Sequence, residues 1–182
     1  KQAYLFDSGR GALLASMRAL ELKPGDEVIL PAFTCAVVPN AVIAAGGTPI
    51  YCDIDPQTLG LDLNQVAQHI TPKTKVILCQ HTFGIPTDTT MLRPICDEHD
   101  LILIEDCAHV IPTAKEQSSL GSQADVVICS FGRDKALSGV SGGATLTANE
   151  SLQAALQKAE ASAKPVSYWR ILNLIDYPLR DA

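Results

Sequence analysis

Two segments of the sequence end an apolar run in side chains that can do chemistry. In LILIEDCAHV, the run ends in Glu105 and Asp106, and His109 follows. In VVICSFGRDKALSGVSGG, the run ends in Ser130, and the polar loop after it carries Lys135. Carboxylates, an imidazole, a hydroxyl and an amine are the groups on which acid–base and covalent catalysis depend. These two segments are therefore the first candidates for a catalytic site.

Lys135 lies in a loop of small residues, which suits a lysine that reacts. A lysine partly removed from water loses its proton more easily and can form a Schiff base. Asp106 ends a different apolar run, and neighbouring strands lie ~4.8 Å apart, so the two groups suit opposite ends of a pyridine ring. This pair is the protein part of pyridoxal phosphate (PLP) chemistry. The alternative for Lys135 is an ordinary solvated surface charge.

A third segment, DSGRGALLA, suits the phosphate of such a cofactor. Ser8, Gly9 and Gly11 stand at the start of an expected helix, where free N–H groups and the helix dipole attract anions. A plain helix N-cap is the alternative. A dinucleotide fingerprint is a poor match, because the third glycine is missing and no strand is evident before the segment. A nicotinamide-binding domain is therefore disfavoured.

The elements that would position these groups follow from the apolar pattern. Near-continuous apolar runs predict buried parallel strands, and Pro and Gly separate them from helical segments. Strands and helices that alternate at this spacing predict an α/β fold with three layers and a mostly parallel sheet. The expected strands are 27–31, 48–53, 75–80, 101–106, 126–131 and 143–148, and the expected helices are 10–21, 36–45, 62–69 and 88–99.

In sheets of this kind, ligands bind beyond the carboxyl ends of the strands. Glu105, Asp106, His109, Ser130 and Lys135 all fall at or just after such ends, and His81 follows the strand expected at 75–80. We therefore expect these six side chains near one rim of the sheet.

Composition excludes several other classes of protein. The 182 residues suffice for one α/β domain, and the net charge of −6 with scattered Lys and Arg argues against nucleic-acid binding. No apolar run approaches the ~18 residues of a membrane span, and the start lacks the layout of a signal peptide, so we expect a cytoplasmic protein. The six cysteines form no C-x-x-C pair and suit small buried side chains in a reducing compartment.

Along nearly its whole length, the chain resembles the DegT/DnrJ/StrS-type aminotransferases. These are PLP enzymes of the aspartate-aminotransferase fold, and most of them make amino sugars on nucleotide carriers. The serine five residues before the lysine, and the aspartate three before His, are specific when both occur in order. The segments that carry the resemblance are SGRGALLASMRALELKPGDEVILPAFTC, GGTPIYCDIDPQTLGLD, ITPKTKVILCQHTFGIPTD, LILIEDCAH and SFGRDKALSGVSGG.

The resemblance implies a role for each matching residue. Lys135 would bond the cofactor covalently, and Asp106 would keep its pyridine nitrogen protonated. Taken alone, His109 would otherwise suit a core histidine bonded to backbone. The further implied contacts are His109 beside the phenolic oxygen, Ala108 beneath the ring, and Ser130 with the backbone at Arg10 and Gly11 around the phosphate.

Three positions depart from the family pattern. The family usually has an aromatic residue stacked on the ring where this chain has Cys35, often Thr where Arg10 stands, and an acidic residue where Ser141 stands. If Cys35 faces the ring, one contact with the cofactor is weaker. Alternatively, Phe33 or His81 supplies the face and Cys35 only packs.

The resemblance also implies how this sequence relates to a whole enzyme. We expect 1–164 to form the PLP-binding large domain without the family's N-terminal segment. Residues 165–182, with the amphipathic stretch YWRILNLIDY, would begin the connection to a smaller C-terminal domain. Family active sites borrow residues from a second subunit, so a homodimer is expected.

The activity implied is transfer of an amino group, with glutamate as donor, to a nucleotide-linked keto-sugar. A dehydrase branch of the family has histidine in place of the lysine, and Lys135 argues against it. The alternative function is a non-catalytic binding or regulatory member that keeps the fold.

Overall fold

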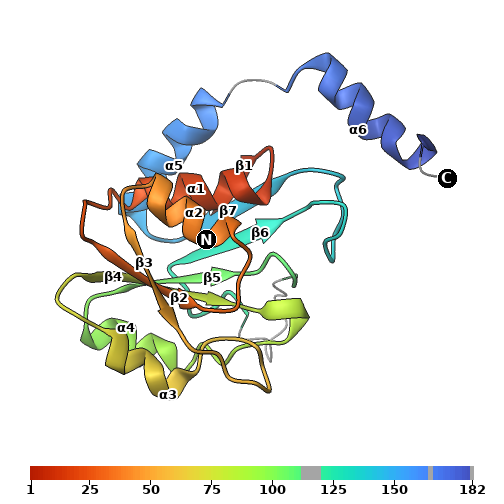
Figure 1. The fold of residues 1–182 in the computed structure, drawn as a ribbon. Coiled ribbons are helices and arrows are strands. Elements are labelled where there is room, and N and C mark those ends of the chain that lie inside the picture. The colour runs from red at the N-terminus through yellow and green to blue at the C-terminus, as the bar shows by residue number, and fades with distance from the viewer. Residues whose placement is uncertain (112–119, 164–165, 181–182) are drawn as a thin grey trace.

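The computed structural model describes residues 1–111, 120–163 and 166–180, and it has three layers (Figure 1). Helices α1, α2 and α5 cover one face of a central sheet, and α3 and α4 cover the other. The elements are β1 (Gln2–Phe6), α1 (Gly9–Ala19), β2 (Glu27–Pro31), α2 (Val37–Ala44), β3 (Thr48–Cys52), α3 (Leu63–Val66), the 3-10 turn η1 (Ala67–His69), β4 (Thr74–Gln80), the 3-10 turn η2 (Thr82–Gly84), α4 (Leu92–Glu98), β5 (Ile102–Asp106), β6 (Val126–Ser130), β7 (Gly143–Thr147), α5 (Glu150–Ser162) and α6 (Tyr168–Arg180).

The seven strands form one sheet in the order β1-β7-β6-β5-β4-β2-β3. The run from β6 to β3 is parallel throughout, and β7 is antiparallel to both of its neighbours. The predicted three-layer α/β fold with a mostly parallel sheet is therefore confirmed.

Alternation along the central strands divides the core in two. On β5, Ile104 packs into the apolar cluster beneath α1, α2 and α5, whereas Leu103 packs into the cluster on the side of α3 and α4. Cys107, just beyond β5, belongs with Leu103. Successive side chains point to opposite faces of a strand, so Glu105 lies on the side of Leu103 and Asp106 on the side of Ile104.

The expectation that no strand precedes the first helix was wrong. β1 runs antiparallel to β7 at the edge of the sheet, with Tyr4 as its one buried side chain. An edge strand needs fewer apolar residues than a central one, so five residues of mixed polarity gave little signal. Helix α5 was not predicted either. Its 13 residues place only Leu152 and Leu156 in the core.

Other boundaries moved by a few residues. The expected helix 88–99 is shorter, as α4, and 62–69 divides into α3 and η1. The stretch YWRILNLIDY is helical, as part of α6. The expected domain boundary between 164 and 165 lies outside the described residues.

Among the described residues, no helix has both the length and the apolar character needed to cross a membrane. All six cysteines are free thiols, and all but Cys35 are buried.

Candidate functional site

The sheet brings the predicted site residues to one rim. Asp106 ends β5 and pairs in register with Gln80 at the end of β4, and Ser130 ends β6 opposite Gly143. Gly143 also pairs with Phe6 at the end of β1, so the loops after β1, β4, β5 and β6 leave the sheet on the same side. This is the edge at which α/β sheets bind ligands.

Asp106 is a buried carboxylate with little compensation from the protein. Its Oδ1 accepts a hydrogen bond from the Ala108 N–H at 2.9 Å, and no ion pair to it occurs among the described residues. Desolvation raises the pKa of Asp106, against the opposing effects of the Ala108 N–H and of the charges on His109, His81 and Lys135. A cation beside this carboxylate would be held strongly.

His109 is fixed by the turn after β4. Its Nδ1 accepts a hydrogen bond from the Phe83 N–H at 3.1 Å. The Phe83 ring lies parallel to the imidazole, with an interplanar angle of 3° and centroids 5.8 Å apart. Because Nδ1 is an acceptor, the neutral imidazole carries its proton on Nε2. His109 can therefore donate a hydrogen bond from Nε2.

Lys135 lies in the loop between β6 and β7, with only 17% of its side chain exposed. Its N–H donates to the Gly132 carbonyl at 3.1 Å, which folds the loop back toward β6. Its Nζ lies 3.2 Å from Asp134 Oδ2, and this contact lowers the pKa of the Asp134 carboxyl. The amine is thus partly withdrawn from water, with an acceptor at hand.

Small residues let the first turn of α1 lie directly on the end of β6. A Cβ added at Gly9 would fall 2.6 Å from Cβ and Oγ of Ser130, and one added at Gly143 would fall 2.5 Å from the Ser8 and Gly9 backbone. Ser8 caps the helix, its Oγ accepting from the Gly11 N–H at 3.1 Å. The first N–H groups of a helix have no acceptor within it, so an anion fits beside Ser130.

These features fit PLP at both ends. The helix N-terminus and Ser130 suit a phosphate, and the uncompensated Asp106 suits a pyridinium nitrogen. The charge of Lys135 lowers the pKa of Asp106, so the amine and the carboxylate lie within electrostatic reach of each other.

Comparison with known proteins agrees with this arrangement. Residues 1–170 match the model of the DegT/DnrJ/EryC1/StrS aminotransferase family. The chain belongs to this family. The fold and the resemblance expected from the sequence are thereby confirmed.

Two curated relatives illustrate the family. The chain is 36% identical, over 84% of its length and 40% of the relative's, to dTDP-4-dehydro-2,3,6-trideoxy-D-glucose 4-aminotransferase of Saccharopolyspora spinosa. It is 42% identical, over 80% of its length and 32% of the relative's, to 3-oxo-glucose-6-phosphate:glutamate aminotransferase of Bacillus subtilis. The chain therefore spans less than half of these proteins.

A solved family structure extends the likeness to three dimensions. The structure of NtdA from Bacillus subtilis, with bound cofactor PMP, superposes with a TM-score of 0.79 at 36% identity. The match covers 90% of this chain and 38% of that one.

Cys35, which the sequence places where the family usually has an aromatic residue, is an exposed thiol in the loop after β2. Of the two suggested substitutes for the missing aromatic ring, His81 is excluded, because it is fully buried and bonded to Glu105. Phe33 is 46% exposed and meets Phe83 edge to face, with ring centroids 6.0 Å apart. Phe33 therefore stays a candidate for the ring-facing position.

Two residues at the rim were not singled out from the sequence. Phe83, which holds His109, is 68% exposed, and an aromatic residue directly before Gly in the loop HTFGIP was the available signal. Asp134 stands next to Lys135 in SFGRDK, and an acidic residue directly before the candidate lysine was a second signal.

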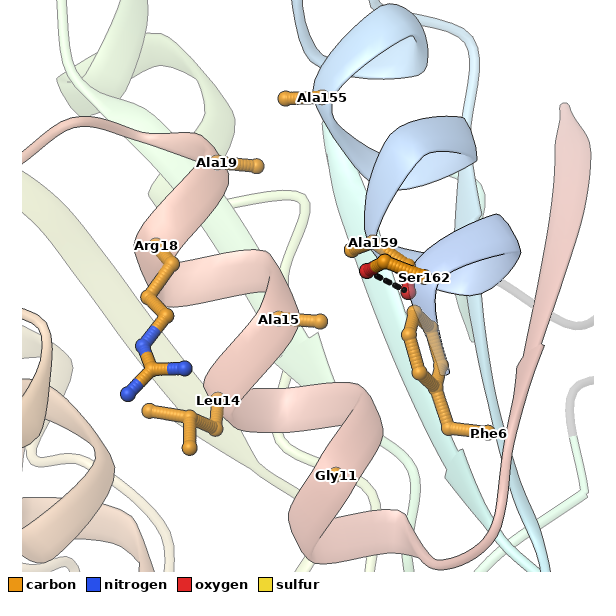
Figure 2. Close-up of a pocket in the computed structure, with 9 residues that line it drawn as sticks. All are labelled: Phe6, Gly11, Leu14, Ala15, Arg18, Ala19, Ala155, Ala159 and Ser162. Atoms are coloured by element: carbon orange, nitrogen blue, oxygen red, sulfur yellow. Dashed lines mark hydrogen bonds between the residues drawn. The ribbon is translucent and has the colours of Figure 1, made fainter. Parts of the chain in front are cut away.

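A groove of about 300 Å³ lies between α1 and α5. Figure 2 shows its lining, which includes four alanines, Arg18 and, at the start of α1, Gly11. It has no group suited to catalysis.

Proposed function

We propose that this chain is the PLP-binding part of an aminotransferase that converts the keto group of a nucleotide-linked sugar to an amine, with glutamate as amino donor. The observation that carries the proposal is Asp106, which is buried without an ion pair among the described residues, while Lys135 stands at the same rim and its charge lowers the pKa of Asp106. The names of the two relatives, one acting on a dTDP-sugar and one a glutamate aminotransferase, support the substrate class and the donor.

Different residues of the rim would bind different parts of the cofactor. Ser130 Oγ and the first N–H groups of α1, at Arg10 and at Gly11 once its N–H leaves Ser8 Oγ, would hold the phosphate. Asp106 would accept the pyridinium N–H, Ala108 would lie under the ring, and His109 would donate from Nε2 to the phenolic oxygen. When bound, PLP supplies an electron sink for the carbanion that forms at the donor carbon.

Lys135 would serve in two ways. It would bond PLP covalently between reactions, and its free amine would carry the proton that leaves the donor carbon. The carboxylate of Asp134, 3.2 Å away, would receive the ammonium group at the stage when Lys135 holds that proton. We also propose that two chains share the active site in a homodimer, as the family resemblance implies.

Reduction of the full-length protein with borohydride tests the site. Peptide mass mapping should find a pyridoxyl group on Lys135, and the Lys135→Ala protein should carry none. Lys158→Ala, a change on the surface of α5, is the matched control and should label as the wild type does. A pyridoxyl group on Lys73 or Lys75 would overturn the assignment.

A spectrum recorded with glutamate separates this function from the alternative, a non-catalytic member of the family. The exposed Cys35, in place of the usual aromatic residue, is the observation that favours that alternative. An aminotransferase changes its visible absorption when glutamate is added in the absence of a sugar. A protein that is labelled on Lys135 but keeps its spectrum with glutamate would be non-catalytic.

A further inference from the structure

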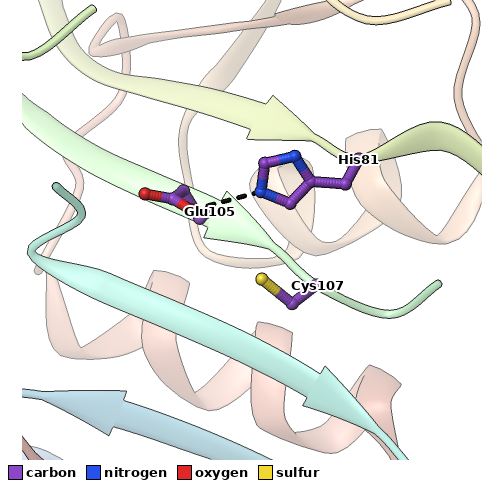
Figure 3. A group of neighbouring side chains, drawn as sticks. All are labelled: His81, Glu105 and Cys107. Carbon is purple, nitrogen blue, oxygen red and sulfur yellow. Dashed lines mark hydrogen bonds and ion pairs between the residues drawn. The ribbon is translucent and has the colours of Figure 1, made fainter. Parts of the chain in front are cut away.

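A buried histidine and a buried glutamate pair on the opposite side of the sheet from Asp106. Figure 3 shows His81, just after β4, directed at Glu105 near the end of β5. His81 Nε2 lies 3.1 Å from Glu105 Oε2, and neither side chain has any exposed surface. Oε2 also accepts from the Gly121 N–H at 2.6 Å, while Oε1 has no hydrogen bond among the described residues.

Both nitrogens of the His81 ring are used, and this fixes its tautomer. Nδ1 accepts a hydrogen bond from the Thr87 N–H at 3.2 Å, so the proton of the neutral ring is on Nε2 and is donated to Glu105. Thr87 is held a second time, because its Oγ1 donates to the Gln80 carbonyl at 3.1 Å. Glu105 thus keeps the Nδ1 lone pair of His81 available for Thr87.

The segment between His81 and Thr87 is the turn that contacts His109. The Gly84 N–H donates to the His81 carbonyl at 3.2 Å, and Phe83 has a φ of 54°, in the left-handed region that few side chains adopt unforced. Phe83 in turn donates its N–H to His109 Nδ1. His81 therefore holds the turn at Gly84 and at Thr87, and Phe83 within the turn sets the orientation of the His109 ring.

We propose that His81 and Glu105 are positioning residues, which hold the turn 82–87 so that Phe83 fixes the plane and tautomer of His109. The pair itself lies on the face of the sheet away from the cofactor side. That His109 then faces the phenolic oxygen of PLP rests on the proposed function, whereas the effect on His109 itself does not.

The same cluster has residue types that bind metals, since ligand atoms of His81, Glu105 and Cys107 lie within 4.8 Å of one another. Its bonding favours the positioning role. Burial raises the pKa of the Cys107 thiol, whereas metals bind the thiolate. His81 Nε2 carries a proton that it donates to Glu105, and Oε2 already accepts two hydrogen bonds. A metal would have to displace these bonds.

Two substitutions at His81 separate its two bonds. Asparagine places its amide near the position of Nδ1 and can still accept from Thr87, whereas glutamine reaches the position of Nε2 and can still donate to Glu105. If His81 acts through Thr87, His81→Gln should disturb His109 and His81→Asn should not.

The readout in the cofactor-free, full-length protein is the ¹⁵N NMR spectrum of the histidine rings. Wild-type His109 should show a protonated Nε2 and a bare Nδ1, as should His81. In His81→Gln the His109 signals should move toward a mixture of tautomers, and in His81→Asn they should stay in place. The proposal is wrong if the His109 signals are unchanged in both variants, or if they change equally in both. If neither variant folds, the wild-type spectrum decides, because a proton on Nδ1 of either ring overturns it.

A second experiment tests whether His81 and Glu105 affect bound PLP. The pH midpoint of the visible band of bound PLP should shift in His81→Gln by roughly 0.5 unit or more, about a threefold change in proton affinity. The same substitution made in His109→Ala should cause no further shift. An equal shift in both backgrounds would contradict positioning through His109. Failure of the wild type to bind PLP would instead refute the proposed function and leave the NMR result standing.

Discussion

Glu105 and Asp106 are adjacent buried carboxylates that the fold treats in opposite ways. Glu105 points toward the side of α3 and α4, where His81 and the Gly121 N–H both donate to one of its oxygens. Asp106 points toward the side of α1 and, among the described residues, receives one hydrogen bond, from the Ala108 N–H. A side chain therefore donates to the first carboxylate, whereas none of the described side chains donates to the second.

This difference teaches that burial alone does not mark a functional carboxylate. Both side chains are almost inaccessible, at 0% and 6% exposure. The distinguishing feature is a side-chain donor: His81 bonds Glu105, although Glu105 Oε1 has no hydrogen bond among the described residues, whereas the donor to Asp106 there is a backbone N–H. An incompletely paired buried charge costs free energy in the empty protein, and a ligand of opposite charge recovers it.

The largest expected effect comes from removing the charge of Asp106. Asp106→Asn in the full-length protein should bind PLP yet lose roughly 10²–10⁴-fold in transamination, because the carboxylate acts on charge that develops in the transition state. Steady-state rates and PLP titration measure the two quantities separately. Asp97→Asn, on the exposed side of α4, is the control. Turnover near that of the wild type would remove Asp106 from the chemistry.

Replacing Glu105 should chiefly lower the free energy of unfolding. Glu105→Ala leaves His81 Nε2 and the Gly121 N–H buried without an acceptor, and each buried donor left without a partner costs about 1–3 kcal/mol. Chemical denaturation of the cofactor-free protein measures the loss. Glu98→Ala, an exposed change at the end of α4, should stay within ~0.5 kcal/mol of wild type. A loss that small at Glu105 would mean that its partners are satisfied by water.

The contact between α1 and β6 can be tested with two glycines. Gly9→Ala would force a Cβ to within 2.6 Å of Ser130, whereas in Gly11→Ala the nearest atom is the carboxylate oxygen of Asp7 at 3.0 Å, which can move. We expect Gly9→Ala to weaken PLP binding by roughly tenfold, about 1.4 kcal/mol, and Gly11→Ala to change it little. Fluorescence titration with PLP gives both affinities. Equal affinities would show that the approach of α1 to Ser130 does not shape the site.

The pH dependence of the empty protein follows from the raised pKa of Asp106. Between the ordinary value of 3.8 and the raised value, the folded state holds a proton that the unfolded state has lost, so stability falls as pH rises through this window. Asp106→Asn has no such proton. Its melting temperature relative to wild type should therefore rise with pH, by ~2–4 °C for each kcal/mol. Thermal scans from pH 4 to 8 without cofactor measure this, and parallel curves would contradict the raised pKa.

The sequence predicted the position of Asp106, on the cofactor side of the sheet, better than it predicted the pairing of Glu105 on the opposite side. Strand ends are local features, so the positions of Asp106 and Ser130 followed from apolar runs and from the rule that ligands bind at carboxyl ends. The edge strand β1 and the small apolar face of α5 carried too weak a pattern to be found.

The pairings across the sheet could not be read from the chain. His81 was placed at the rim and suggested as a ring-facing group, but its partner stands 24 residues away, on the other face of β5. His81 continues the alternation of β4 on the side of Ile77 and Cys79, so its pairing with Glu105 depends on the register of β4 with β5, which places Glu105 opposite Cys79. The contact of Phe83 with His109 depends on the turn after β4, where Phe83 has a left-handed φ.

The smallest expected effect concerns Cys35, where this chain departs from its family. If Cys35 faces the pyridine ring, a thiol stands in place of an aromatic ring, and the stacking free energy of ~0.5–1.5 kcal/mol is lost. Cys35→Phe should then tighten PLP binding by roughly two- to tenfold. Because Cys35 is exposed, the added ring need not strain the core, where overpacking costs ~1–3 kcal/mol.

Phe33 provides the matched comparison for Cys35. Phe33→Leu keeps an apolar side chain but removes the ring that meets Phe83 edge to face. If Cys35 is the ring-facing position, Cys35→Phe tightens PLP binding and Phe33→Leu leaves it nearly unchanged. The opposite result is that Phe33→Leu weakens PLP binding while a stable Cys35→Phe protein binds PLP as the wild type does. Phe33 would then be the ring that stacks on the cofactor, and the alignment of Cys35 with the family's aromatic residue would be wrong. The cofactor side of the rim would then keep the family's aromatic ring, and the roles proposed for Asp106 and Lys135 would be unchanged.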